Sequence, residues 1–304
     1  MTHSPTSFPF MPPAAHQRGF TMVEMIIVIT VTAIVAGMLY VFIRTPIQAY
    51  VDTVARVAAS DAADTAVRRI ARDVRLALPN SIRVSGDYLE FLETSGALRY
   101  QSEDDVDATL DPTLYLNWND ASKVTFAVIG GVPTGRHRPV AGNFLVVYNL
   151  GETQEPANAY NCASGVCNRA TIKIVSTATI TLESNPFVPP PALPPPALPL
   201  EAALKSPGHR AHVVTGPVTY HCDKVRKQLW RYSGYAITVA QGVTPPAGAR
   251  AGLLASNVED CAFRYASMAS QRGALLGFGL TLGIPGQAQG TIKLEHQIHV
   301  NNTP

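Results

Sequence analysis

The chain has 304 residues and a formal net charge of +2 at neutral pH, and 46% of its residues are hydrophobic. This length suffices for a membrane anchor and one globular domain, or for two small domains. A charge this nearly balanced, with no run of five lysines or arginines, argues against a nucleic-acid-binding protein. The 24 prolines and 22 glycines favour a turn-rich β domain over a helical bundle.

One apolar segment, residues 20–43, follows directly after Arg18 and Gly19. About 24 helical residues, at 1.5 Å each, cross a hydrocarbon core of about 30 Å. No other segment of the sequence is long and apolar enough to do so. Glu24 lies near the start of this segment, where an unpaired carboxylate is costly, so we expect it to be functional.

Two ordinary explanations of this segment fit poorly. A secretory signal peptide needs small residues at a cleavage site after a short apolar core. Val35-Ala36-Gly37 is a poor match, and the apolar run continues to Ile43. A plain single-span anchor explains the length but gives no role to Gly19 or Glu24.

The stretch Gly19-Phe20-Thr21-Met22-Val23-Glu24 has the pattern G-F-T-x-x-E, and it resembles the leader of type IV prepilins. The resemblance implies that a prepilin peptidase removes residues 1–19, cutting between Gly19 and Phe20, and N-methylates Phe20. A glycine before the cut adds no bulk and weakens helix there. In a stack of subunits Glu24 would meet the freed amine of a neighbour, so that neither charge is buried alone.

Residues 44–78 are predicted to continue the same helix outside the membrane. Apolar residues recur there at steps of three or four, and Asp64 and Arg68 have the spacing of a helical ion pair. Pro46 predicts a kink or thinning of the helix. The helix should end at Leu78, because Pro79 disfavours a helical conformation in the residue before it. The arginines of this stretch are interpreted as a solvated face, with an acidic partner as the alternative.

Residues 79–304 read as a β-rich head, which gives an α+β fold with a long helix packed on antiparallel sheet. Short segments rich in Val, Ile, Thr and aromatic residues are separated by Gly, Pro, Asn and Asp. The expected strands are 81–84, 88–93, 98–101, 123–129, 143–148, 169–176, 212–221, 228–236, 275–284 and 290–300.

A proline-rich segment, residues 185–207, contains a doubled PPPAL unit and favours polyproline II. It is interpreted as an exposed loop or a linker between two halves of the β region. A docking site for a proline-binding partner is the alternative.

Four cysteines, Cys162, Cys167, Cys222 and Cys261, allow three pairings. The short spacing of the first two favours a Cys162–Cys167 bridge, which leaves Cys222 with Cys261. If the head lies outside the cytosol, as the membrane segment indicates, disulfides persist there. Four free thiols in a reducing compartment remain the alternative.

The resemblance extends beyond the leader. Residues 46–84, the motif Val258-x-x-Cys261-x-Phe263-x-Tyr265 and residues 296–301 are similar to the O-type minor pilins of the mannose-sensitive haemagglutinin (MSHA) pilus system. The overall plan is also similar to J-type minor pseudopilins of type II secretion. Both resemblances imply a low-abundance subunit that primes or caps a filament.

Catalytic and metal signals are weak. The sequence has no P-loop, no G-x-S-x-G and no HExxH, so we expect neither an enzyme nor a cofactor. The glycines of 277–283 lack the strand-turn-helix context of a nucleotide-binding loop and are interpreted as packing glycines. The acidic run 103–107 with Asp111 is interpreted as a solvated loop, with a calcium site as the alternative. His209, His212 and the run His221-Cys222-Asp223 could bind zinc, but Cys222 is better used in a disulfide. His296 and His299 are interpreted as edge or core residues of a strand.

The sequence therefore predicts a single-pass inner-membrane protein with a periplasmic head, a minor pilin that primes or caps an MSHA-type pilus. Its expected partners are other minor and major pilins, the prepilin peptidase and the inner-membrane assembly platform. A J-type pseudopilin and a tip adhesin remain the alternatives, and a periplasmic enzyme with a borrowed anchor is the least favoured.

Overall fold

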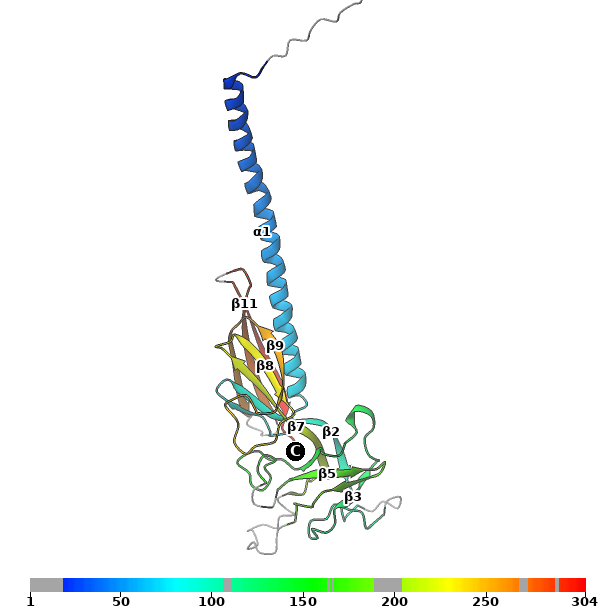
Figure 1. Cartoon of the computed structure of the whole chain (residues 1–304). Helices are drawn as coiled ribbons and strands as arrows, with labels where there is room; N and C mark the ends of the chain where they lie inside the picture. Colours follow the sequence, from blue (N-terminus) through cyan, green and yellow to red (C-terminus); the bar gives the residue numbers. More distant parts are fainter. Residues whose placement is uncertain are drawn as a thin grey trace, which may run out of the picture. The chain divides into compact units, whose positions relative to one another are not determined.

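The structure is a computed structural model that describes residues 19–105, 111–162, 165, 167–188, 204–267, 273–287 and 290–304. One long helix, α1 (Met22–Val74), is followed by antiparallel strands, several of which are labelled in Figure 1. The chain divides into two compact units, Met1–Val54 and Ala55–Pro304. The α+β fold predicted from the sequence is confirmed.

The helix α1 runs without interruption through Pro46. The prediction that it continues to Leu78 is wrong, because it ends at Val74. The backbone N–H of Leu78 donates to the carbonyl of Leu92, and that of Thr94 to Leu76, both at 2.8 Å. Residues after Val74 therefore pair with a strand, and these hydrogen bonds replace those of a further helical turn.

Five strands of the head have ten or more residues, and the other seven have seven or fewer. They are β1 (Arg83–Ser85), β2 (Tyr88–Tyr100), β3 (Thr125–Ile129), β4 (Phe144–Val147), β5 (Arg169–Val175), β6 (Thr179–Leu182), β7 (Arg210–Asp223), β8 (Gln228–Ser233), β9 (Arg250–Ser256), β10 (Val258–Ser267), β11 (Gly273–Gly283) and β12 (Thr291–Asn301).

The sequence prediction found most of these strands but misjudged four. It missed β6, β9 and β10, of which β9 is poor in β-branched and aromatic residues. It also divided β2 in two, because Ser95-Gly96 reads as a turn. In the structure these residues form a bulge, with register shifts between Glu93 and Gly96.

One lobe of the head is a closed barrel. Strands β2, β3, β6, β5, β4 and β7 pair in this order, always antiparallel, and β7 pairs back with β2. Closure removes open sheet edges from this lobe. Side chains that include Tyr100, Phe126, Leu145 and Ile172 form its buried core.

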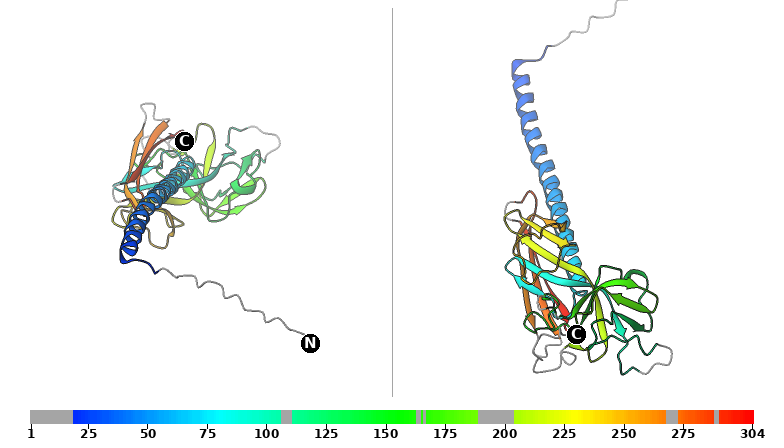
Figure 2. Two further views of the ribbon diagram at one scale, coloured as in Figure 1. Left: turned by 90° about the horizontal axis from the view of Figure 1, so that it is seen from above. Right: turned by 60° about the horizontal axis from the view of Figure 1, so that its bottom comes forward.

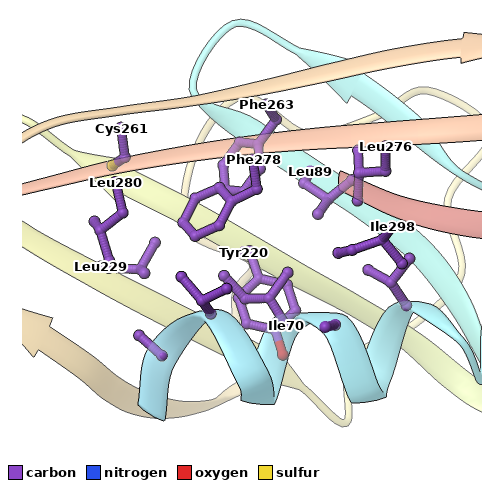
Figure 3. Packing of buried hydrophobic residues seen from close by; sticks show 14 of the residues in the cluster. Ile70, Leu89, Tyr220, Leu229, Cys261, Phe263, Leu276, Phe278, Leu280 and Ile298 are labelled. Carbon is purple, nitrogen blue, oxygen red and sulfur yellow. The ribbon is translucent and has the colours of Figure 1, made fainter. Parts of the chain in front are cut away.

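The other lobe holds the second half of α1. The first part of β2 and the last part of β7 extend into it with β1, β8 and β9, and β10, β11 and β12 form a separate three-stranded sheet. Figure 2 shows these strands beside the helix and the barrel strands apart from it. Ile70 of the helix faces Tyr220 of β7, and Phe278 of β11 completes the same core (Figure 3).

The strands β2 and β7 pass through both lobes and connect them. Each changes partners near its middle, where β2 is bulged and Gly216 of β7 has a φ of 144°, which favours glycine. A bulge bends a strand and increases its twist. These irregularities therefore allow each of the two strands to belong to the open sheet at one end and to the barrel at the other.

Most of the proline-rich segment, residues 189–203, lies outside the described residues. Its flanking residues Phe187 and Leu204 are fully buried in the barrel core rather than exposed. The strands on either side, β6 and β7, both belong to the barrel. The segment therefore connects two strands of one lobe, and does not join two separate halves of the β region.

Candidate functional site

The chain enters α1 through a capped turn. Gly19, Phe20 and Thr21 precede the helix and are exposed. The Thr21 hydroxyl accepts a hydrogen bond from the backbone N–H of Glu24 at 3.3 Å, as an N-cap residue does. Thr-x-x-Glu is also the spacing of a capping box. Glu24 therefore has a local role at the helix start that the sequence analysis did not consider.

The electrostatics of this turn favour a carboxylate. Glu24 lies in the first turn of α1 and its side chain is exposed. Backbone N–H groups at a helix start carry partial positive charge, so an acidic side chain there is stabilising. The residues that sequence analysis assigned to processing and assembly, Gly19, Phe20 and Glu24, lie together within two turns of chain.

The segment after Glu24 presents apolar side chains all round. Large hydrophobic residues from Met22 to Ile43 are exposed, and this is the one helix in the described part of the chain that is long and apolar enough to span a membrane. The hydroxyls of Thr30 and Thr32 donate to carbonyls of the preceding turn, at 2.9 and 3.1 Å. Because these polar groups are satisfied within the helix, they can lie in hydrocarbon at low cost.

The four cysteines of the head are joined in the pairs that the sequence favoured. Cys162 and Cys167 close a short loop, with their Cα atoms 5.0 Å apart. Cys222 and Cys261 have Cα atoms 6.0 Å apart and connect β7 to β10. The second bridge therefore ties the three-stranded sheet to the larger one.

The acidic run near residue 105 is occupied by contacts within the protein. The carboxylate of Asp105 accepts hydrogen bonds from Arg99 at 2.9 Å and from the backbone N–H of Ser102 at 2.8 Å, and it lies 3.1 Å from the His209 ring. Desolvation would raise its pKa, but the Ser102 hydrogen bond and the neighbouring His209 and Arg99 side chains lower the pKa below its usual value. Val106 and Asp107 lie outside the described residues.

The histidines do not converge on a metal site. Burial, with the charge of Arg210, lowers the pKa of His212 to about 4, and the His221 ring stacks on Tyr88 with centroids 4.1 Å apart. His296 and His299 lie on β12, where His299 is exposed. Over the residues that the structure describes, no three His, Cys, Asp or Glu side chains could hold a metal ion.

The glycines of 277–283 lie in a regular strand. The pairing of β11 with β12 runs from Gly273 to Gly283 without a register shift. Gly277 and Gly279 line the floor of an open surface groove of about 410 Å³, between β10 and β12. The alternation of large and small residues along β11 therefore has a structural explanation. The large apolar side chains pack in the core on one face, and the glycines lie on the opposite face.

A buried ionic cluster, which no local sequence pattern predicted, fixes the helix to the head. Asp73 accepts hydrogen bonds from Tyr220 at 2.8 Å and from Arg231 at 2.7 Å, and Arg69 lies 3.1 Å away. Burial, and then the charge of Asp73, raise the pKa of Tyr220, so its hydroxyl stays protonated. The spacing of Arg69 and Asp73 was visible in the sequence, but Arg231 is distant along the chain.

The comparison with known families adds one finding. Residues 14–40 match the family model described as the prokaryotic N-terminal methylation motif. No curated protein and no solved structure matches the chain significantly. The motif and the exposed apolar helix support a type IV pilin-like protein, either a pilin or a pseudopilin.

Proposed function

We propose that this chain is a minor pilin that primes or caps assembly of an MSHA-type IV pilus. The observation that carries the proposal is the methylation motif at residues 14–40, placed at the start of a single apolar helix. The resemblance of residues 46–84 and of the last strands to O-type minor pilins supplies the pilus type. A J-type pseudopilin of type II secretion is the second candidate, because the same motif fits it equally well.

Processing is proposed at the turn that precedes α1. The leader, residues 1–19, is removed by cleavage between Gly19 and Phe20, and Phe20 is N-methylated. Non-helical backbone at Gly19 and Phe20 supports this position, because a peptidase needs access to extended chain. Residues 20–43 then anchor the mature protein in the inner membrane, residues 44–78 continue into the periplasm, and residues 79–304 form the head.

The role proposed for Glu24 follows from the charge that cleavage creates. The new amine of Phe20 lies at the positive end of the helix dipole, where a cation is unfavourable. A carboxylate from a neighbouring subunit offsets this charge, and the amine offsets the burial of the carboxylate. Each Glu24 would thereby align one subunit against the next during assembly.

The size of the head favours a minor role. Residues 79–304 fold into two lobes, the closed barrel and the lobe that packs on the second half of α1. A head this large would crowd neighbouring subunits in a helical shaft. A tip or an initiating complex leaves one side of the head unobstructed. The partners proposed on this basis are other minor and major pilins and the inner-membrane assembly platform.

The Glu24 proposal can be separated from simple helix capping. Gln fits a capping box as well as Glu does but carries no charge. Glu24→Ala and Glu24→Gln should therefore both be processed, and both should enter sheared pilus fractions about tenfold less or worse, since a buried charge loses its partner. Asp61→Ala, which removes an exposed acid farther along α1, is the control. Normal incorporation of the Gln variant would contradict charge pairing.

Deletion of the chain in the cells that produce it tests the assignment itself. We expect loss of surface pili in sheared fractions and unchanged exoprotein levels in the medium. Loss of secretion with pili intact would instead identify a J-type pseudopilin. Pili and secretion both at normal levels would contradict either candidate.

A further inference from the structure

The strand β9 is an open edge of the large sheet. It pairs with β8 and with no other strand of the described head. Its sequence, RAGLLAS, has no charged residue after Arg250, and Leu253 is 50% exposed. An exposed, uncharged edge strand offers unpaired N–H and C=O groups to another strand.

The other edge strands of the described head are β1, β10 and β12. The strand β10 carries the charged residues Glu259, Asp260 and Arg264. At β1 the side chain of Gln241 donates to the carbonyls of Arg83 and Tyr88, and the Arg83 guanidinium donates to the carbonyl of Thr238. Residues 238–241 therefore cover this edge. The edge strand β12 carries the charged pair Lys293 and Glu295, 2.7 Å apart. Charges and covering loops are the usual means by which proteins block edge pairing, and β9 carries no charge after Arg250.

A groove of about 430 Å³ lies beside this edge, between β9 and the helix. Leu253 and Leu254 form its strand wall, and Arg68, Arg69 and Arg72 line its helix wall. The groove thus combines apolar side chains on one wall, the unpaired backbone edge of β9 beside it, and a row of guanidinium groups on the other wall.

The positive charge along the groove is only partly compensated. Asp73 is buried and shared between Arg231 at 2.7 Å and Arg69 at 3.1 Å. The Arg72 side chain is 65% exposed, and its nearest carboxylate oxygen, again of Asp73, is 3.9 Å away. Arg72 is therefore free to pair with a carboxylate that enters the groove.

A row of cross-strand neighbours also ends at β9. Tyr88, His221, Trp230 and Leu253 lie opposite one another across four successive strands. Cross-strand neighbours of this kind are the units that stabilise a sheet. An apolar residue on an added strand would continue the row beyond Leu253.

We propose that β9 accepts an extended segment of another pilin-type subunit as a further strand of the sheet. The segment lies in the groove, places an apolar side chain against Leu253 and pairs a carboxylate with Arg72. Backbone hydrogen bonds along the edge supply affinity, and the side chains on the two faces supply specificity. The identity of the partner as a pilin-type subunit rests on the proposed function, whereas the docking edge itself rests on the geometry.

The test uses the full chain in the cells that produce it. A photo-crosslinking residue at Ala251, an exposed position on β9, should form an adduct with a different pilin-type subunit, through a peptide that contains Asp or Glu. The same probe at Val225, which is 95% exposed in the β7–β8 turn, should not. Leu253→Lys and Arg72→Glu should each reduce the Ala251 adduct about tenfold, since a lost ion pair or a charged edge opposes docking.

The control substitution is Ile174→Lys on β5, because Ile174 is 57% exposed and lies on a strand remote from the groove. It should leave the adduct unchanged. An equal adduct from Val225, an adduct with a second copy of this chain, or insensitivity to Leu253→Lys would overturn the proposal.

The docking proposal and the proposed function can be refuted by different results. If deletion of the chain abolishes pili while the Leu253→Lys strain keeps both pili and the Ala251 adduct, the docking edge is refuted and the assembly role stands. If deletion leaves pili and secretion normal, the assembly role is refuted, and the adduct at Ala251 still decides whether β9 is a docking edge.

Discussion

Removal of the Asp73 carboxylate should loosen the helix from the head. This buried side chain accepts hydrogen bonds from Tyr220 and Arg231 and pairs with Arg69. Breaking a buried ion pair by removing one partner costs about 3–5 kcal/mol. Without Asp73, the Arg231 side chain, 16% exposed, keeps only Glu93, at 3.1 Å, as a carboxylate partner. For a domain of about 150–250 residues, 1 kcal/mol changes Tm by about 2–4 °C. Asp73→Ala should therefore lower Tm by about 6–20 °C.

The assay is thermal unfolding of the full chain in detergent, followed by the near-ultraviolet circular dichroism of its aromatic residues. Asp64→Ala is the matched control, because it removes an acid from the same helix whose partner, Arg68, is exposed. Such an exposed pair contributes about 0.3–0.5 kcal/mol, so its Tm should fall by about 2 °C at most. Equal shifts for the two variants would refute the argument that Asp73 fixes the helix.

Two further predictions concern the head. Removing the Cys222–Cys261 bridge with paired Ser substitutions should lower the free energy of unfolding by about 4 kcal/mol, against about 2 kcal/mol for Cys162–Cys167, because loop-closure entropy grows with loop length. Urea unfolding of both double variants measures these two losses. A larger loss from the shorter loop would contradict the prediction. The second concerns pH. The pKa of His212 is lowered to about 4 by burial, so between pH 6.5 and 4 the unfolded chain binds a proton there that the folded chain does not. Stability should therefore fall as pH is lowered through this window, by about 3 kcal/mol at most. Unfolding measured across this range should show a flatter profile in His212→Gln, and identical profiles for the two proteins would contradict the assignment.

The sequence by itself determined the features that depend on neighbouring residues. The processing motif, the apolar helix and the Asp64–Arg68 pair at 2.6 Å are all local patterns, and each could be recognised from spacing alone. The preference for a Cys162–Cys167 bridge also rested on a short separation. Helical periodicity and a leader motif are informative because they need no knowledge of distant contacts.

The helix end and the strand boundaries show where local patterns fail. Pro79 predicted an end at Leu78, but hydrogen bonds to β2 end the helix at Val74. Ser95-Gly96 indicated a turn, yet continued pairing with β7 keeps this stretch within one strand. In both places a partner far along the chain outweighed the local preference.

Only the tertiary structure decided the closed barrel, the cluster at Asp73 and the open edge at β9. Closure depends on β7 pairing with both β4 and β2, and Asp73 meets Arg231 across 158 positions of sequence. A strand lies at a sheet edge when no other strand pairs with its outer side. The sequence of that strand alone does not determine this. These features arise from the packing of segments distant in sequence, and the free energy that selects them comes from burial and pairing that exist only in the folded chain.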